Sequence, residues 1–524
     1  MKLRTIVKIA ITSSVVLLCS GFALYSFFRL SAAEGQKDFN LYELVPSTTS
    51  AVFVTDDVLE FVAEVDELTC SKNQQYLYVS KLFSYLKQSL YALSEDTPHG
   101  LSRQMNQMLI SFHEPDNERN QVLYCRLGNG DKELVNRFVR KYISSLYPPK
   151  TFIYKGEEII IYPMADGDFL ACYLTSDFMA LSFQKKLIEN VIDAYKSGKS
   201  LADDSTFTGI RAPKKSAAAA TIYTRMQGMM GWTEFDMKMK DDFIYFSGIT
   251  HDADTCFAFI NQLRQQQSVK GFPGEVLPST AFYFSRQGIT DWVSLLSYGN
   301  AQGQSVPART SEVQSRDKEF SRYLMENAGQ DLVACLFQRE DTLQGAAAVL
   351  SLSVADVTEA ERMLRALVNA ASADEGRRNP RITFCYTVNK AYLIYRLPQT
   401  TLFEQLTSFV EPTLDVYAAF YGGRLLLAPD ADALTHYIRQ LDKGEVLNGA
   451  MAYQTGMDHL SDSYHFMLMA DFDHIFQQSE NHVRFVPDFF LRNADFFRHF
   501  TLFVQFACAD GMVYPNIVLK YKSE

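Results

Sequence analysis

The sequence predicts an α+β protein: an N-terminal transmembrane helix followed by two tandem, duplicated domains with largely antiparallel sheets and packed helices. Three observations predict this: an uncharged apolar run near the N-terminus, a sequence pattern that occurs twice, and short strands that alternate with single amphipathic helices. The chain has 524 residues, 47% of them hydrophobic, which is enough for more than one core. The expected divisions are a basic cytoplasmic tail at 1–8, an anchor at 9–28, a linker at 29–40, and α+β repeats at 41–268 and 269–524.

The N-terminal region is predicted to cross the cytoplasmic membrane once. Residues 9–28 carry no charge, and about 20 apolar residues at ~1.5 Å rise match the ~30 Å hydrocarbon core. Lys2, Arg4 and Lys8 precede this run, so the N-terminus is expected inside and the bulk of the chain in the periplasm or another extracytoplasmic space. A signal peptide cleaved near the small residues 31–33 stays open as the alternative.

Composition bears on partners and on redox chemistry. The net charge of −11 argues against nucleic acid as a partner, because a field of this sign repels phosphate backbones. Of eight cysteines, no two have the spacing of a zinc knuckle or a redox pair. Several lie in apolar runs, where we expect buried free thiols. The disulfide state of the seven cysteines beyond the anchor stays open.

One sequence pattern occurs twice. A Pro-Ser-Thr segment leads into an apolar strand at 44–62 and again at 276–293, with the two prolines 232 positions apart. Residues 169–201 align without a gap over 415–447, which is a displacement of 246 positions, and Ile222 falls on Leu468 at the same displacement. A register held over such a length indicates an internal duplication.

Hydrophobic periodicity predicts the same order of elements in each half. In the first half we expect strands at 51–54, 108–112 and 122–127, a helix at 132–146, strands around 152 and at 159–162, a helix at 185–196, and closing strands at 234–239 and 243–249. In the second half the corresponding segments are 281–284, 332–337, 347–352, 357–369, around 384, 392–395, 431–442, 502–508 and 512–519. Gly198 and Gly444 are predicted to end the two matching helices in the left-handed conformation.

The remaining segments are predicted to connect these elements. We expect the link between the halves at 265–274, insertions at about 398–412 and 473–495, and a polar loop at 301–315.

The sequence predicts no catalytic, cofactor-binding or metal-ligating residue. Five of nine histidines fall late, but none has the spacing that brings two imidazoles onto one helix face. Acidic pairs such as 430–432 and 471–473 lack the remainder of a calcium loop, so Asp430 and Asp432 are expected at a helix N-terminus, with weak calcium binding left open. Ser-x-x-Lys segments at 84–87 and 315–318 lack the companion motifs of penicillin-recognising enzymes.

A run of phenylalanines between 485 and 506 is the last candidate surface. Its spacing is helical up to residue 500 and then passes into a strand, so core packing is expected for most of it. An exposed insertion at 473–495 would be the segment for a lipid or protein contact.

In its anchor and its two Pro-Ser-Thr openings, the chain resembles uncharacterised bacterial membrane-anchored envelope proteins with a domain of unknown function. The resemblance implies an envelope location but no activity. We therefore expect a non-enzymatic binding or scaffold module outside the cytoplasmic membrane, held by its N-terminal helix, whose partner is an envelope protein or an apolar ligand. No cofactor is expected. The alternative is a hydrolase with an inter-domain site that sequence motifs do not reveal.

Overall fold

A computed structural model describes most of the chain beyond residue 38. It covers residues 39–73, 105–113, 119–128, 131–138, 147–164, 167–211, 218–225, 231–250, 258–296, 310–339, 345–374, 382–388, 390–407, 413–477, 486 and 488–522. Within these ranges no helix combines the length and apolar character needed to span a bilayer. The predicted tail and anchor lie outside the described residues, as does the linker up to residue 38.

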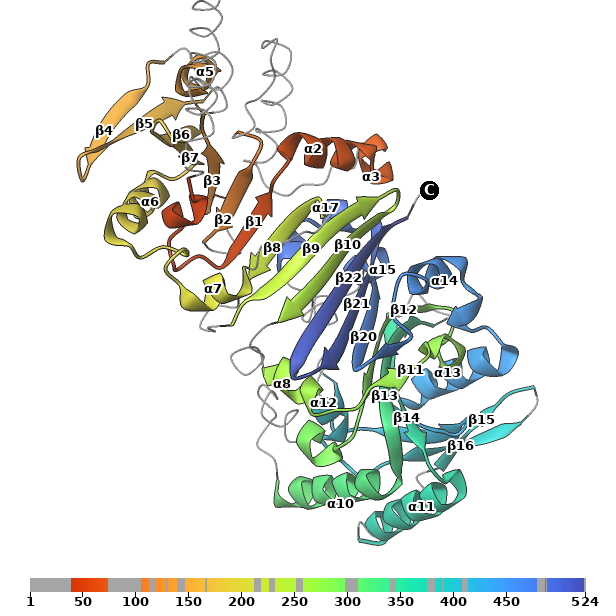
Figure 1. Cartoon of the computed structure of the whole chain (residues 1–524). Helices are drawn as coiled ribbons and strands as arrows, with labels where there is room; N and C mark the ends of the chain where they lie inside the picture. Colours follow the sequence, from red (N-terminus) through yellow and green to blue (C-terminus); the bar gives the residue numbers. More distant parts are fainter. Residues whose placement is uncertain are drawn as a thin grey trace, which may run out of the picture.

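Twenty of the described strands form one large sheet (Figure 1), and two others form a separate two-stranded pair. The first half contributes β1 (Ala51–Thr55), β2 (Met108–Phe112), β3 (Gln121–Arg126), β4 (Lys150–Tyr154), β5 (Glu157–Pro163), β6 (Phe169–Leu174), β7 (Phe178–Ser182), β8 (Ala220–Thr224), β9 (Thr233–Lys240) and β10 (Phe243–Thr250). The second half contributes β12 (Ala281–Gly288), β13 (Ala328–Gln338), β14 (Ala346–Val354), β15 (Ile382–Tyr386), β16 (Ala391–Arg396), β17 (Tyr417–Tyr421), β18 (Arg424–Ala428), β20 (Phe466–Asp471), β21 (Phe500–Ala509) and β22 (Met512–Tyr521).

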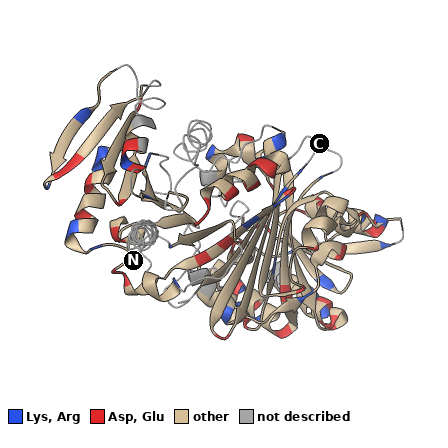
Figure 2. Ribbon diagram, turned by 45° about the horizontal axis from the view of Figure 1, so that its top comes forward, with Lys and Arg blue, Asp and Glu red and all other residues tan. Residues whose placement is uncertain are grey.

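All twenty strands pair antiparallel, which confirms the predicted α+β class with antiparallel strands. Their spatial order is β4-β5-β6-β7-β3-β2-β1-β8-β9-β10-β22-β21-β20-β12-β13-β14-β18-β17-β16-β15. The separate pair is β11 (Val269–Lys270) with β19 (Ser463–Tyr464). The central strands β10 and β21 carry no charged residue, whereas their neighbour β9 carries four, and other charged residues lie on helices and turns (Figure 2).

Helices lie on the faces of the sheet and at its margins (Figure 1). In the first half these are η1 (Leu41–Leu44), α2 (Val58–Glu67), α3 (Thr69–Lys72), α5 (Asp131–Phe138), α6 (Lys185–Ser197) and α7 (Ser205–Ile210). The first half ends with α8 (Ala258–Arg264), and in the second half the helices are η4 (Pro273–Val276), α10 (Ser311–Asn327), α11 (Val357–Asp374), α12 (Leu402–Leu406), α13 (Ala431–Lys443), η5 (Leu447–Gly449), α14 (Met451–Met457), α15 (Phe472–Phe476), α16 (Asp488–Arg492) and α17 (Ala494–Phe497).

The second half repeats the strand order of the first, and it repeats the register as well. The segments carrying β7 and β18 align 246 positions apart in sequence. The observed pairings lead from β7 through β3 and β2 to β1, and from β18 through β14 and β13 to β12. They make Phe53 equivalent to Ser285, and these residues are 232 positions apart, as are the two Pro-Ser-Thr openings. One further strand makes Ile222 equivalent to Leu468, as the sequence alignment predicts. Register and sequence therefore agree at two independent points.

The two halves meet at β10 and β22, which pair antiparallel in the middle of the sheet. Ser247 lies opposite Asn516 in this pairing. The registers of the β9–β10 and β21–β22 hairpins also place Ser247 in the first half at the position that Asn516 has in the second. A local two-fold axis therefore passes through this pair, where the Ser247 hydroxyl donates to Asn516 Oδ1 at 2.9 Å. We expected two domains with separate sheets; the halves instead share one sheet, because pairing β10 with β22 satisfies two edges that would otherwise be open.

One helix in each half packs on the same face of its part of the sheet. Ile188 and Val191 of α6, and Leu434 and Ile438 of α13, are fully buried. Both helices end as predicted, with Gly198 and Gly444 in the left-handed conformation at φ 62° and 78°. The opposite face carries one larger core that runs through both halves.

The structure corrects two predicted connections. The polar loop predicted at 301–315 is wrong from residue 311 onward, because Ser311–Asn327 forms α10, capped by Thr310, whose side chain accepts from the Val313 amide. The few apolar residues of α10 lie at helical spacing within a polar sequence, which hides its amphipathic pattern. The predicted link at 265–274 contains β11 and the start of η4, so it is part of the fold. The predicted helix at 132–146 begins as α5, and residues 139–146 lie outside the described ranges.

Close packing at the seam predicts that Gly248 tolerates no side chain. A Cβ at Gly248 would lie 2.7 Å from ring carbons of Phe235 and 2.8 Å from Pro515 Cγ. We expect Gly248→Ala to lower the free energy of unfolding by about 1–3 kcal/mol. Gly209→Ala in α7, where a Cβ meets no atom within 4 Å, is the matched control and should be neutral or stabilising by up to about 1 kcal/mol. Urea unfolding followed by circular dichroism measures both, and equal effects would contradict the packing at the seam.

Candidate binding surfaces

The outermost strands, β4 and β15, end the sheet at opposite extremities of the molecule (Figure 1). Among the described residues, β4 pairs only with β5 and β15 only with β16. The outer edge of a terminal strand carries backbone N–H and C=O groups available to another chain. The two ends are equivalent in the repeated register, which relates Ile153 of β4 to Phe384 of β15.

Exposed apolar side chains are concentrated at these two ends. Of twelve large hydrophobic residues exposed in the described ranges, seven lie in or beside the three outer strands of either end. At the first end these are Tyr147, Phe152, Ile153 and Phe169, and at the second end Phe384, Tyr386 and Val388. Ile153 is 70% exposed and Phe384 is 54% exposed. Clusters of exposed aromatic and apolar side chains commonly mark the contact surfaces of a protein.

At the second end the exposed side chains form an ordered pair. The rings of Phe384 and Tyr386 are stacked with centroids 6.0 Å apart. Between them Cys385 points to the opposite face, where it is fully buried and its thiol donates to the Thr435 carbonyl of α13 at 3.9 Å. One face of β15 is therefore fixed to the core, while its other face presents two aromatic rings.

A pocket with a volume of about 570 Å³ lies between α8 and the β21–β22 turn, where it is lined by Asn261, Arg264, Gln265, His465, Cys508 and the turn residues 509–511. Burial raises the pKa of the Cys508 thiol to about 11, so it stays protonated at neutral pH. Burial also lowers the pKa of His465, whose Nδ1 accepts from the Cys508 backbone N–H at 3.2 Å. This ring is thus neutral and its bond goes to the backbone, an arrangement suited to holding a polar ligand and not to activating a nucleophile.

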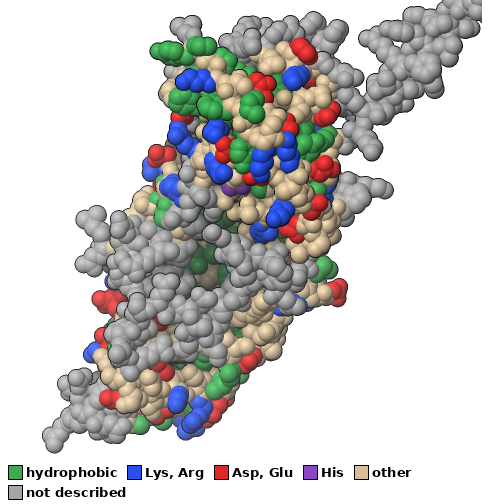
Figure 3. All heavy atoms as spheres, turned by 90° about the vertical axis from the view of Figure 1, so that its left-hand side faces the viewer, with side chains coloured by type: hydrophobic (Ala, Val, Ile, Leu, Met, Phe, Trp, Pro, Cys, Tyr) green, Lys and Arg blue, Asp and Glu red, His purple; other side chains and the backbone are tan. Residues whose placement is uncertain are grey.

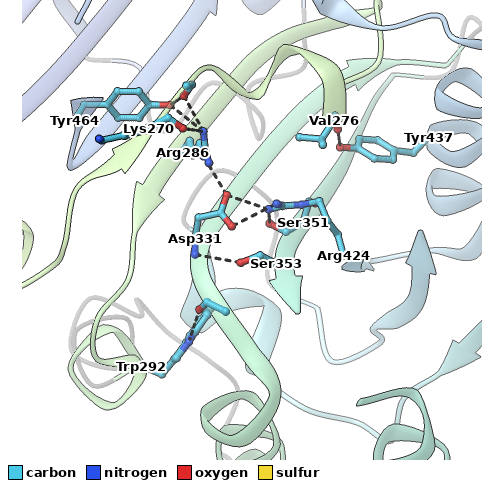
Figure 4. A network of polar contacts seen from close by, with 12 residues as sticks. Lys270, Val276, Arg286, Trp292, Asp331, Ser351, Ser353, Arg424, Tyr437 and Tyr464 are labelled. Atoms are coloured by element: carbon cyan, nitrogen blue, oxygen red, sulfur yellow. Dashed lines mark hydrogen bonds and ion pairs between the residues drawn. The ribbon is translucent and has the colours of Figure 1, made fainter. Parts of the chain in front are cut away.

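A buried ionic network occupies the core of the second half (Figure 4). Asp331 accepts from Arg286 Nε at 3.0 Å and from two nitrogens of Arg424 at 3.3 Å each. Arg286 also donates to the Gly271 carbonyl, and Arg424 donates to Ser351. Burial alone would raise the pKa of Asp331, but Arg424, a hydrogen bond to Ser353 and Arg286 together lower it.

This network is specific to the second half. By register, Arg286, Asp331 and Arg424 correspond to Val54, Gln107 and Phe178. Phe178 is buried and packs its ring against Phe39, Tyr173 and Tyr195. In the first half the two arginines are thus replaced by the apolar Val54 and Phe178, and the carboxylate by the neutral Gln107. We interpret the network of the second half as structural because its carboxylate is fully paired.

Most residues weighed from sequence take structural positions. Asp430 caps α13 by accepting from the Ala433 amide at 2.7 Å, as predicted, and Asp471 caps α15. Ser315 and Lys318 lie exposed on α10, while Asp317 between them is buried against Thr400 and Thr401. The Ser-x-x-Lys segment 84–87 and residues 478–485 of the predicted insertion lie outside the described residues.

The cysteines and phenylalanines largely follow prediction. Five described cysteines are buried free thiols and Cys508 is partly buried. In the phenylalanine run, Phe497, Phe500 and Phe503 are buried in the core, which confirms core packing for these residues. Within the described ranges no group of three histidine, cysteine or acidic side chains is placed to hold a metal ion.

Sequence reasoning missed the exposed end strands. Their segments, 150–154 and 382–386, look like ordinary strands in which apolar residues occur on both faces. That pattern indicates burial unless the strand lies at an edge, and the strand order is not visible in one sequence.

Comparison with known proteins adds no relative. No known family, curated protein or solved structure matches the chain. The resemblance to membrane-anchored envelope proteins stays a prediction.

The ionic network predicts a large difference between two Arg–Asp pairs. Asp331→Asn leaves two largely buried guanidinium groups, 16% and 13% exposed, without their counter-charge and should lower the free energy of unfolding by about 3 kcal/mol. Asp415→Asn breaks the exposed Arg396–Asp415 pair and should cost under about 1 kcal/mol. Because the folded-state pKa of Asp331 is lowered, its contribution is present at pH 7 and is lost as the pH falls below about 4. Urea unfolding of both variants at pH 7 and below pH ~4 measures these changes in the free energy of unfolding. Equal losses for Asp331→Asn and Asp415→Asn at pH 7 would contradict a buried network.

Proposed function

We propose that this chain is a single-pass envelope protein, anchored in the cytoplasmic membrane with its N-terminus inside, that binds another envelope protein through the outer strand β15. The bulk of the chain then lies outside the cytoplasmic membrane as a non-enzymatic binding or scaffold module. The observation that carries this proposal is the outer edge of β15, beyond which no described strand pairs, combined with the exposed Phe384 and Tyr386 rings. The anchor rests on the uncharged run at 9–28.

Strand addition fits the geometry of this end. An extended segment of a partner would hydrogen-bond along the open edge of β15, which supplies affinity without regard to sequence. The stacked rings of Phe384 and Tyr386 would supply selectivity for apolar side chains that alternate along the added strand. The buried Cys385 between them holds the strand in one orientation.

The chemistry of the pocket favours binding over hydrolysis. A hydrolase would need an activated nucleophile or a positioned acid and base. In the pocket the Cys508 thiol is protonated, and the His465 Nδ1 is engaged by a backbone amide. The carboxylate of Asp331 is enclosed by two arginines in the core. We therefore propose a binding module and not a hydrolase.

We also propose that the two halves arose by duplication of one α+β unit, with the divisions near 41–268 and 269–524. The matching strand order and register support a common origin. In this interpretation the unit first associated with a second copy through the strand that became β10 and β22. Fusion then fixed that two-fold pair in one chain.

A photo-crosslinking residue at Tyr386 in intact cells tests the proposal. We expect one reproducible adduct with an envelope protein, and Phe384→Asp in the same chain should reduce its yield at least about tenfold, as loss of an aromatic anchor does. The control is the same crosslinker at Lys318, an exposed position on α10.

Three results would overturn this function: an adduct unaffected by Phe384→Asp, equal crosslinking from Lys318, or turnover of a small molecule by the purified protein.

A further inference from the structure

We propose that the first end of the sheet, formed by β4–β6 and α6, rests on the surface of the bilayer that holds the chain's own anchor. This inference rests on the proposed membrane anchoring and adds an orientation to it. The contact surface is the outer end of the sheet: Phe152, Phe169 and Tyr195 are exposed on the α6 side, and Ile153 is exposed on the other face of the outermost strand β4. We call these four residues the membrane-facing patch. Figure 3 shows this end of the molecule in the upper part of the view, where hydrophobic side chains are mixed with basic and acidic ones.

The chain enters the fold at this patch. Phe39 is the first described residue, and its ring lies 4.8 Å from that of Phe178 and 5.9 Å from that of Tyr195. Only ten residues, 29–38, separate Phe39 from the predicted anchor. At ~3.3–3.6 Å per residue they reach at most about 35 Å. The patch is thereby kept near the bilayer.

The far end of the sheet, at β15, cannot contact the bilayer at the same time as β4 when the sheet stands away from the membrane surface. The sheet has twenty strands, and neighbouring strands are ~4.8 Å apart, so β15 lies up to about 90 Å away along the sheet. The two ends lie at opposite extremities in Figure 1. A bilayer contact at β4 therefore leaves β15 directed away from the membrane, where a partner can reach it.

The patch is more apolar than its equivalent in the second half. By register, Phe152 corresponds to Thr383 and Phe169 to Asp415. Asp415 pairs with Arg396 at 3.0 Å, as expected for a surface in water. Two positions that are polar at the far end are thus phenylalanine at the end beside the anchor.

Five lysines border the patch, namely Lys150, Lys155, Lys185, Lys186 and Lys196. The last four form ion pairs with Asp193, Glu189 and Glu157, and because these pairs are exposed their ammonium groups can also reach lipid phosphate. Lys185 Nζ lies 5.5 Å from the centre of the Phe152 ring. Aromatic rings at the level of the headgroups, with lysine ammonium groups extending to phosphate, are typical of protein surfaces at a bilayer interface. This combination favours a lipid surface over an apolar protein groove.

The hairpin that carries the patch is held rigidly against α6. The Tyr154 hydroxyl donates to Asp193 at 3.1 Å, and Lys155 forms an ion pair with the same carboxylate at 2.7 Å. Lys196 donates to the Lys155 carbonyl at 2.6 Å. The β4–β5 hairpin, α6 and the entry point at Phe39 are therefore linked by direct contacts, so that contact at the patch would orient the first half.

Tryptophan fluorescence in liposomes tests this orientation. The full chain, carrying Ile153→Trp or the register-equivalent Phe384→Trp, is reconstituted in vesicles of zwitterionic and anionic phospholipid with or without lipids brominated high in the acyl chain. The native Trp232 and Trp292 are buried and give the same background in both variants. The Ile153→Trp signal should fall by roughly half in brominated vesicles, because interfacial groups sit about 5–10 Å into the boundary region. The Phe384→Trp signal should stay unchanged.

A second variant separates membrane contact from a structural role. Phe152→Thr and Phe169→Asp, introduced together with Ile153→Trp, give the first end the residues of the second, which the same fold accepts at the equivalent positions. We expect the quenching to be lost while the circular dichroism spectrum is kept.

The outcomes distinguish this inference from the proposed function. Release of the full chain from membranes by alkaline carbonate would overturn the proposed anchoring itself. Membrane-embedded protein with no quenching of Ile153→Trp, or with equal quenching of both variants, would overturn only the orientation. A discrete protein adduct, or a second copy of the chain, captured by a crosslinker at Ile153 would also overturn it.

Discussion

The pairing of β10 with β22 is the interaction on which the rest of the structure depends. Each of these strands would be an exposed edge in an isolated half, with a row of unpaired backbone groups. Their antiparallel pairing makes one sheet of the two halves and places a two-fold axis at Ser247 and Asn516. Because the pairing occurs at one edge of each half, it also determines which strands remain outermost. Among the described strands, the outermost positions of β4 and β15 are a direct consequence of this seam.

Symmetry of the backbone has allowed the side chains to diverge. Equivalent positions hold the aromatic Phe178 in the first half and Arg424 in the second. At the ends, Phe169 corresponds to Asp415. In each case the hydrogen-bonded framework is kept while the environment changes, because backbone pairing fixes the register independently of side-chain chemistry. Two ends of one architecture can thus face different surroundings, as the proposed tethering at one end would require.

The sequence allowed the strands and the repeat to be predicted well, for physical reasons. Alternating and helical periodicities are local, so segments such as 108–112 and 185–196 fall within a residue of β2 and α6. The helices α6 and α13 end where predicted, because Gly198 and Gly444 adopt the left-handed backbone conformation. The polar helix α10 escaped prediction, because tertiary contacts of a few buried residues, such as Phe320 and Leu324, stabilise it more than its composition indicates.

What sequence reasoning could not supply is the order of the strands, and the candidate surfaces depend on that order. The β4 segment has apolar residues on both faces, which in the interior of a sheet would mean double burial. It becomes a surface only because no described strand lies beyond it. The same holds for Phe384 and Tyr386 in β15. The buried network around Asp331 was hidden for a related reason, since its members are separated by 45 and 93 positions in the chain. Surfaces and networks of this kind arise from topology, and a repeat with two open ends gives one chain two of them, which can diverge because they never meet.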